Sequence, residues 1–248
     1  MLTSIRVKDN RKIYAASAEK EDAPFKCPKC GEETILKKGL IKTDHFAHKP
    51  PVTCQYGLGE SEAHRKCKQD IFDHLVKHED VLECEMEKDF DTVVSDIYYR
   101  TKNLRIAIEV QVSSLTMEKI IYRTQKYERL GIYVLWLPLF NKNLNKSRYS
   151  PKQWEKWIHA TYYGRVYYWL NGLSILPVHF EDYLLYVELT EYGGGYDRKS
   201  KRYRKPYIGN PLNLLDDFKP RERNYWTSNT IVVPKCKILM DSYDAWWK

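Results

Sequence analysis

IAIEVQVS, residues 106–113, is the stretch that decides the fold, because apolar and polar side chains alternate along it. This period of two predicts a β-strand with its isoleucines and valines on one face and with Glu109 and Gln111 on the other. Burying a carboxylate in such a strand is costly unless a partner compensates its charge. A divalent cation held by Glu109 and by Asp96, which lies upstream, would compensate it, and Gln111 would touch whatever the cation binds. The alternative is an edge strand whose polar face is solvated.

The segments around this strand predict a mixed sheet with helices on its faces. Two strand-like runs precede it, at residues 81–90 and 92–100, and residues 116–130 have the periodicity of an amphipathic helix that Gly131 would end. A continuously apolar run at residues 132–137 predicts a strand in the interior of the sheet. Because a crossover helix joins strands of the same direction, the strands on either side of this helix should be parallel.

A further helix is expected upstream, from Ser61 as its N-cap to about residue 77. Ser61, His64 and Lys68 recur at the spacing of one helical face, and Glu60 lies beside them. A solvated helical face would show the same stripe, so the pattern alone does not make these residues functional.

The N-terminal segment predicts a structural zinc site. Cys27 and Cys30 stand in the sequence CPKCG, in which a tight turn carries two thiolates and the glycine lets backbone amides turn toward sulfur. His45, His48 and Cys54 follow, and four ligands from these five residues would complete a tetrahedral site. The spacing of the two histidines is one residue short of the usual range, so Cys54 is the alternative to one of them. The competing interpretation is a pair of free cysteines near surface histidines.

Charge and composition favour an intracellular protein with a polyanionic partner. The chain has 248 residues; residues 1–140 carry 23 basic and 22 acidic side chains, whereas residues 141–248 carry 18 and 11. The basic excess of the second part suggests contact with nucleic acid. There is no run of about 18 apolar residues and no apolar secretory segment at the start, so we expect no membrane segment and a cytoplasmic protein. In that compartment the six cysteines would be thiols or metal ligands.

The C-terminal part predicts an α+β region whose fold the pattern does not define. Trp154 and Trp157 would lie on a short helix with Pro151 in its first turn, and residues 183–190 resemble a strand. After a glycine break, RKSKRYRK at residues 198–205 is the densest basic run of the chain. Six cations around a tyrosine suit phosphate contacts and base stacking, whereas the alternative is a solvated loop.

Taken together, the order of elements resembles the PD-(D/E)XK nuclease superfamily, and the chain resembles the competence protein CoiA family more closely. Several motifs in the family's order carry the resemblance, well over residues 1–140 and more loosely over residues 165–180. They are YAASA at 14–18, CPKCG at 27–31, KKG at 37–39, HFAHK at 45–49, ESEAH at 60–64 with Lys68, EVQVS at 109–113 and GIYVLW at 131–136.

The resemblance implies an α/β fold, with a restriction-endonuclease-like mixed sheet flanked by helices. It implies a zinc-finger-like N-terminal module at residues 1–58, a nuclease-like domain at 59–140 and a basic, aromatic-rich C-terminal region at 141–248. It also implies Mg²⁺- or Mn²⁺-dependent hydrolysis of DNA, single-stranded or branched DNA included, during uptake, transformation and recombination, with a recombination protein as a further partner.

The same resemblance assigns roles within the site. Asp96 and Glu109 would bind the catalytic cation, and Gln111 would stand where the superfamily usually has lysine. Glu62, His64 and Lys68 would approach from the helix, with His64 or Lys68 stabilising the phosphate or assisting proton transfer.

Two departures from the family pattern leave other functions open. Val94 and Ser95 precede Asp96 where the family tends to have arginine or proline, and Gln111 brings no positive charge. A catalytically inactive module that binds DNA or assists recombination is therefore an alternative. A nuclease that acts against foreign DNA would use the same chemistry.

Overall fold

The computed structural model describes residues 1–54, 56–57, 59–111 and 115–248 and shows a mixed α/β chain. The chain divides into two units, residues 1–103 and residues 104–248. The boundaries expected at residues 58 and 140 stay predictions, because they delimit functional modules rather than these two units.

Three α-helices lie within the described residues: α1 (Glu62–Leu75), α2 (Met117–Arg129) and α3 (Gln153–Thr161). Two short 3-10 helices, η1 (Lys20–Asp22) and η2 (Lys142–Asn145), accompany them. None of the helices in the described part of the chain is long and apolar enough to cross a membrane.

The first unit begins with a small sheet in which all neighbouring strands run antiparallel, in the order β2-β1-β3-β4-β5. Its strands are β1 (Thr3–Arg6), β2 (Arg11–Tyr14), β3 (Phe25–Lys26), β4 (Glu33–Lys37) and β5 (His45–His48). Phe25, Leu36 and Phe46 form its core with Met1 and Cys27. Few large apolar side chains are buried here, which is typical of modules that depend on a metal for folding energy.

The same unit continues with α1 and an antiparallel hairpin of β6 (Glu83–Asp89) and β7 (Val94–Arg100), against which α1 packs. The predicted N-cap is confirmed, because Ser61 Oγ accepts a 3.2 Å hydrogen bond from the His64 backbone N–H. Ile71 and Leu75 form part of the buried side of the helix. The stripe of Ser61, His64 and Lys68 follows the predicted spacing, but Lys68 is buried rather than solvated.

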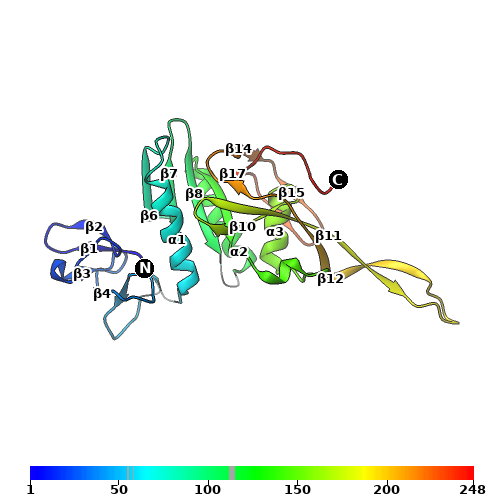
Figure 1. Ribbon diagram of the computed structural model, residues 1–248, viewed down its shortest axis with the longest axis horizontal. Helices are drawn as coiled ribbons and strands as arrows, with labels where there is room; N and C mark the ends of the chain where they lie inside the picture. The colour runs from blue at the N-terminus through cyan, green and yellow to red at the C-terminus, as the bar shows by residue number, and fades with distance from the viewer. Residues whose placement is uncertain (55, 58, 112–114) are drawn as a thin grey trace. The chain divides into compact units, whose positions relative to one another are not determined.

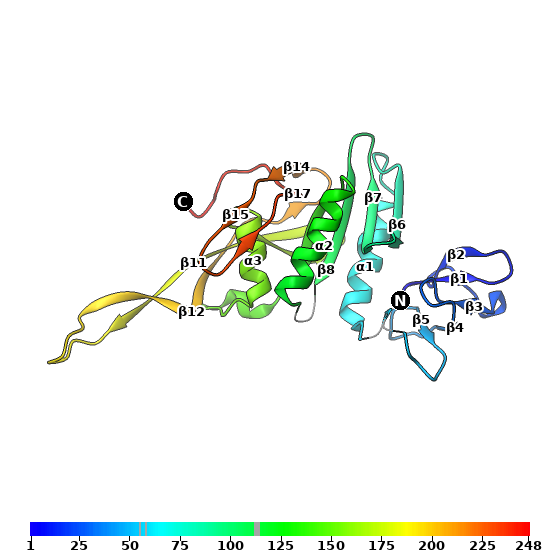
Figure 2. The ribbon, with the colours of Figure 1, turned by 180° about the vertical axis from the view of Figure 1, so that it is seen from behind.

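The second unit contains two strands of the mixed sheet that the sequence predicts, together with the crossover helix between them. β8 (Arg105–Gln111) and β9 (Tyr133–Pro138) pair in parallel on either side of α2, as a crossover helix requires. α2 packs against β9 and β17 (Cys236–Asp241), and Figure 2 shows it running along the strands. Thr116 caps this helix, and Gly131 follows its end with φ of +68°, a conformation that glycine adopts without strain. The predicted end of the strand, at residues 112–113, lies outside the described residues.

Strands from the far end of the chain complete this sheet, which the sequence did not predict. β17 runs parallel to β9, with Ile238 opposite Val134, and β14 (Phe218–Arg223) runs antiparallel to β17. In this part of the chain the sheet order is therefore β14-β17-β9-β8. About 100 residues separate the paired strands in sequence, and only their contacts in the folded protein join them.

The C-terminal region forms a second sheet, with β11 between β10 and β12 and with β13 also paired to β11. Figure 1 shows β11 and β12 continuing together as a long two-stranded arm. The strand expected at residues 183–190 is confirmed as far as Val187, but it is the end of a longer strand, β11, which begins at Ser174. One local prediction was wrong: Pro151 precedes the Lys152 cap instead of lying in the first turn of α3. The remaining strands are β10 (Val166–Asn171), β11 (Ser174–Val187), β12 (Tyr196–Ile208), β13 (Leu212–Asn213), β15 (Trp226–Thr227) and β16 (Val232–Val233).

Candidate functional site

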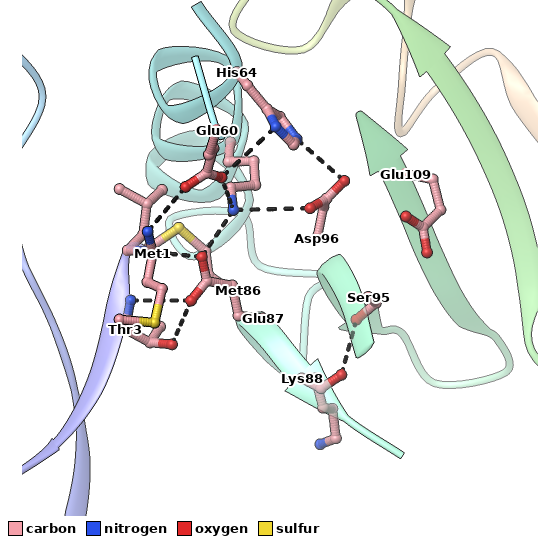
Figure 3. A network of polar contacts seen from close by, with 12 residues as sticks. Met1, Thr3, Glu60, His64, Met86, Glu87, Lys88, Ser95, Asp96 and Glu109 are labelled. Carbon is pink, nitrogen blue, oxygen red and sulfur yellow. Dashed lines mark hydrogen bonds and ion pairs between the residues drawn. The ribbon is translucent and has the colours of Figure 1, made fainter. Parts of the chain in front are cut away.

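A buried lysine lies at the centre of a group of carboxylates in the first unit. The Lys68 side chain on α1 is 2% exposed, and its Nζ contacts Glu60, lies 2.8 Å from Glu87 Oε1 and 3.7 Å from Asp96 Oδ1. Figure 3 shows Glu60 from the segment just before α1, Glu87 from β6 and Asp96 from β7 converging. Burial lowers the pKa of Lys68, but the three carboxylates outweigh burial and raise that pKa above its ordinary value. The ammonium is therefore charged and holds the three acidic residues together.

His64 links two of these carboxylates at the more open side of the group. Its Nε2 lies 3.3 Å from Asp96 Oδ2, and its Nδ1 lies 3.7 Å from Glu60 Oε1. Burial opposes protonation, but the nearby Asp96 carboxylate outweighs it, and the pKa of His64 is raised. The imidazolium form is thus favoured up to a higher pH than in a free histidine, so His64 can hold a proton next to Asp96.

Glu87 is a member of this group that the sequence analysis missed. It accepts hydrogen bonds from the Leu2 and Thr3 backbone N–H groups at 2.8 and 3.2 Å and from Thr3 Oγ1 at 2.6 Å. Tyr56 donates a further one at 3.3 Å. Burial raises the pKa of Glu87, but the charge of Lys68 and these donors outweigh it and hold the pKa at about 2. Glu87 therefore joins β1 to the helix that carries Lys68.

The register of the β6–β7 hairpin could have identified Glu87 as a neighbour of Asp96. Met86 pairs with Ile97 and Lys88 with Ser95, so Glu87 and Asp96 occupy the positions between them and share a face. Glu87 also has φ of +51°, in the left-handed region that side chains other than glycine rarely adopt. Such strain is commonly found at functional sites.

Glu62 lies on α1 but points to other partners. It accepts hydrogen bonds from the Thr43 backbone N–H and from Thr43 Oγ1, both at 2.6 Å, and from Arg65 at 3.0 Å. Burial raises the pKa of Glu62, but the hydrogen bonds from Thr43 outweigh burial and lower the pKa to about 2. Glu60, which comes just before the helix, is instead the glutamate that contacts Lys68. Glu62 anchors the loop before β5.

The predicted carboxylate of the second unit is buried and has partners on α2. Glu109 is 2% exposed, with Arg123 at one carboxylate oxygen and the Tyr127 hydroxyl at the other. Gln111 is also buried, at the end of β8. A solvated polar face, the simplest interpretation of this strand, is therefore wrong. Glu109 belongs to an Arg123–Glu109–Tyr127 group, so its charge has a cationic partner within its own unit.

A second cluster in the first unit could hold a metal ion. One ligand atom each of Cys27, Cys30, His48 and Cys54 lies within 4.8 Å of all the others. The Lys29 backbone N–H donates to Cys27 Sγ at 3.4 Å, and the Tyr56 N–H donates to Cys54 Sγ at the same distance. Such N–H···S contacts and the donor set of three sulfurs and one imidazole fit a thiolate-bound metal.

His45, the fifth candidate, faces away from this cluster. Residues of β5 alternate between two faces, so His45 and His48, three positions apart, point to opposite sides of the strand. His45 Nδ1 lies 2.9 Å from the Thr43 carbonyl oxygen, and His45 pairs with Lys37 across the hairpin. The alternation of the strand thus distinguishes the two histidines.

The basic run lies on a strand and not in a loop. Residues 198–205 belong to β12, on the arm that Figure 1 shows. Asp182 of β11 pairs with Lys199 at 2.5 Å and lies 3.8 Å from Arg204, whereas Lys201 and Arg202 are exposed. Arg202 also lies 5.3 Å from the Tyr203 ring. Part of the basic charge is thus neutralised within the arm, and part faces solvent.

Comparison with known proteins gives matches over both units. A sequence model described as the nuclease-like domain of competence protein CoiA matches residues 60–183, half of the chain, and one described as the N-terminal domain of competence protein CoiA matches residues 8–57. Competence protein CoiA of Bacillus subtilis strain 168 is 29% identical over 116 residues, 46% of this chain and 31% of that protein. The match thus spans about a third of the relative's length. No solved structure matches.

Glu87→Gln should destabilise the protein in a pH-dependent way. A carboxylate whose pKa is about 2 when folded, against about 4.5 when unfolded, contributes stability above pH 4.5 that disappears as the pH falls toward 2. We expect the variant to lose on the order of 3 kcal/mol of unfolding free energy at pH 7, and the difference from wild type to shrink below pH 4.5. Urea unfolding followed by circular dichroism at several pH values measures this difference. The exposed Glu79→Gln is the control, and a loss that is independent of pH would contradict the assignment.

Proposed function

Because the chain belongs to the competence protein CoiA family, we propose that it is a metal-dependent nuclease that hydrolyses phosphodiester bonds of DNA. Its place would be the processing of DNA taken up during competence, before or during recombination. The fold we propose for the nuclease-like part is that of the PD-(D/E)XK superfamily. The succession of α1, the β6–β7 hairpin, β8, α2 and β9 along the chain supports it, as does the parallel pairing of β8 with β9.

The observation that carries the proposal is the position of Asp96 in the carboxylate group. Its side chain is 19% exposed, whereas Glu60 and Glu87 are buried around Lys68. A carboxylate at the open side of a buried group of paired charges can reach a solvated ligand, while the residues behind it fix its position. Asp96 is therefore the acidic residue of this group best placed to meet a cation.

An oxygen donor of this kind fits Mg²⁺ or Mn²⁺, which favour carboxylates and keep several of their waters. When bound, such a cation supplies Lewis acidity toward the phosphate and lowers the pKa of an attacking water. Glu109 is the second ligand that the family pattern implies. Its carboxylate is already held by Arg123 and Tyr127, so its role stays a prediction from the sequence.

His64 and Lys68 would have different roles in the reaction. His64 is hydrogen-bonded to Asp96 and is 20% exposed, so its imidazolium can give a proton to the leaving oxygen of the cleaved bond. Lys68 is buried and bound to Glu60 and Glu87, so it positions the carboxylates and does not contact the phosphate. The sequence allows either residue to stabilise the phosphate, and the burial of Lys68 favours His64.

A second candidate function is a non-catalytic module that binds DNA or a recombination protein. Two facts favour it: Gln111 is neutral, and Lys68, which could replace the missing charge, is enclosed by carboxylates. The nuclease and the non-catalytic module differ in whether the protein cleaves DNA in a way that depends on Asp96.

For the Cys27, Cys30, His48 and Cys54 cluster we propose Zn²⁺ in a structural role. Four protein ligands would leave no open position for a substrate or water, which distinguishes structural from catalytic zinc. The small core of the five-stranded sheet supports a role in folding.

Replacing His48 should remove the metal, whereas replacing His45 should not. We expect about one zinc ion per chain in wild type and in His45→Ala, and a clear loss in His48→Ala, because only His48 lies in the cluster. Inductively coupled plasma mass spectrometry of the purified proteins measures the metal content. Equal zinc content in the two variants, whether full or lost, would show that the ligand set is different.

Asp96→Asn should abolish cleavage without weakening DNA binding. The substitution removes the negative charge from the open side of the group, and we expect a loss of at least about a hundredfold in Mn²⁺-dependent nicking. The assay compares single-stranded, duplex and branched DNA with purified protein. Asp91→Asn makes the same change at an exposed position of the same hairpin and serves as the control. If wild type and Asp96→Asn cut equally, the cleavage does not arise from this site. If neither cuts while both bind DNA, the non-catalytic module is the better description.

Charge reversal on the arm should weaken DNA binding and its salt dependence. Arg198, Lys201 and Arg202 are exposed on β12, and each phosphate contact that is lost should lower the slope of log K against log salt by about 0.7 to 0.9. Fluorescence anisotropy with labelled DNA from about 50 to 300 mM salt measures both quantities. The matched control is the triple change to glutamate at Lys142, Lys146 and Lys248, which are exposed elsewhere in the same unit. An unchanged affinity and slope in the arm variant would exclude this surface.

A further inference from the structure

The loop between β4 and β5 exposes two large apolar side chains that no other described residue of the first unit covers. Leu40 is fully exposed and Ile41 is 94% exposed, next to each other at the tip of the hairpin. Scattered exposed apolar residues are ordinary, but two adjacent ones with almost no contact area on the protein leave a hydrophobic tip in water. Such a tip is suited to insertion into a partner.

The charge around the tip selects an anionic partner. The sequence from 37 to 42 is KKGLIK, so lysines stand on both sides of Leu40 and Ile41, and Lys37 and Lys42 are exposed. Glu33 and Asp44 are the nearest acidic residues along the hairpin. Glu33 pairs with Lys49, and Glu19 pairs with Lys38 at 2.9 Å. The tip thus combines two apolar side chains, Leu40 and Ile41, with lysines on both sides of them.

The outer face of the same hairpin continues this surface. Ile35 pairs with Ala47 and Lys37 with His45, and these four residues lie on the side of the sheet opposite to Leu36 and Phe46 in the core. An open hollow of about 570 Å³ is lined by residues 37–42 with His45 and Ala47. His45, which the metal cluster does not use, therefore belongs to this surface.

The base of the loop is fixed, so the tip has a defined direction. Lys37 and His45 form the last pair of the β4–β5 ladder, from which the loop extends. Within the loop, Thr43 donates two hydrogen bonds to Glu62 on α1. α1 also carries His64 and Lys68, the helix residues of the candidate site. A ligand held at the tip would thus have a fixed position relative to α1, the helix that carries His64 and Lys68.

We infer that Leu40 and Ile41 form a wedge that enters between neighbouring bases of DNA, while Lys37 and Lys42 contact the flanking phosphates. Apolar side chains inserted at a base step unstack it at a cost that is smallest where the stacking is already broken. The substrate class that this geometry fits is therefore DNA with a discontinuity, such as a fork or a junction of single and double strands. The inference rests on the proposed function for the identity of the partner, and it adds where and in which form DNA is held.

The test is unstacking of a fluorescent base analogue by the full-length protein. A forked DNA with 2-aminopurine at the branch is titrated without added Mn²⁺, so that cleavage does not interfere. We expect the fluorescence to rise on binding to wild type, and the rise to disappear in the double variant Leu40→Ser, Ile41→Ser, with affinity weakened on the order of tenfold. Leu82→Ser, at an exposed leucine of the same unit, should behave as wild type.

A second variant separates the unstacking by Leu40 and Ile41 from the phosphate contacts of the lysines. Lys37→Gln with Lys42→Gln should lower the salt dependence of binding by about 0.7 to 0.9 per lysine, while the fluorescence rise persists at saturating protein. Zinc content and circular dichroism equal to those of wild type show that each variant is folded. The inference is overturned if the serine variant unstacks the fork as wild type does, or if it loses binding to vesicles of anionic phosphatidylglycerol while its DNA affinity is unchanged.

The outcome is independent of whether the protein cuts DNA. If wild type cleaves nothing but unstacks the fork in a way that needs Leu40 and Ile41, the nuclease proposal fails and the wedge stands. If Asp96→Asn abolishes cleavage but the serine variant cuts forked and unbranched duplex DNA at the wild-type ratio, the nuclease stands and the wedge fails.

Discussion

The burial of the Lys68 ammonium among three carboxylates is the interaction on which the rest of the first unit depends. An isolated charge in this position would cost several kcal/mol, and so would each carboxylate without a partner. One lysine does not balance Glu60, Glu87 and Asp96, so the excess negative charge needs other donors. His64 supplies one of them at Asp96, and the amides of Leu2 and Thr3 supply others at Glu87. The group is therefore stable only when α1, the β6–β7 hairpin and β1 are all in place.

This charge balance also limits the chemistry that the site can perform. A lysine bound by two carboxylates at hydrogen-bonding distance is unavailable to a phosphate, and Gln111 contributes no charge. Positive charge at the substrate must then come from His64, from a bound cation, or from residues outside the group. The Asp96 carboxylate raises the pKa of His64, so the His64 imidazolium keeps a positive charge at the open side of the group. A metal-dependent reaction with histidine as the acid is consistent with this distribution of charge.

Much of the local structure could be predicted from the sequence, because it depends on local interactions. The Ser61 cap, the stop at Gly131 and the parallel pairing across α2 follow from capping chemistry and from the geometry of a crossover. The position of Glu87 opposite Asp96 was also accessible, since it follows from the hairpin register, but it requires the turn to be placed correctly. The pairing of β17 with β9 was not accessible, because nothing in either segment specifies a partner about 100 residues away.

The two histidines of β5 connect the metal cluster with the rest of the unit. Because side chains alternate along a strand, His48 points to the metal cluster and His45 to the outer face. A metal bound by His48 would therefore also fix the orientation of His45. Because Phe46, between them, donates its backbone N–H to the carbonyl of Met1, the start of β1 is held by the same strand. The residues that follow, Leu2 and Thr3, donate to Glu87. A structural metal would therefore act on the site through β5, β1 and Glu87, by keeping in place the backbone donors that balance the buried charges around Lys68.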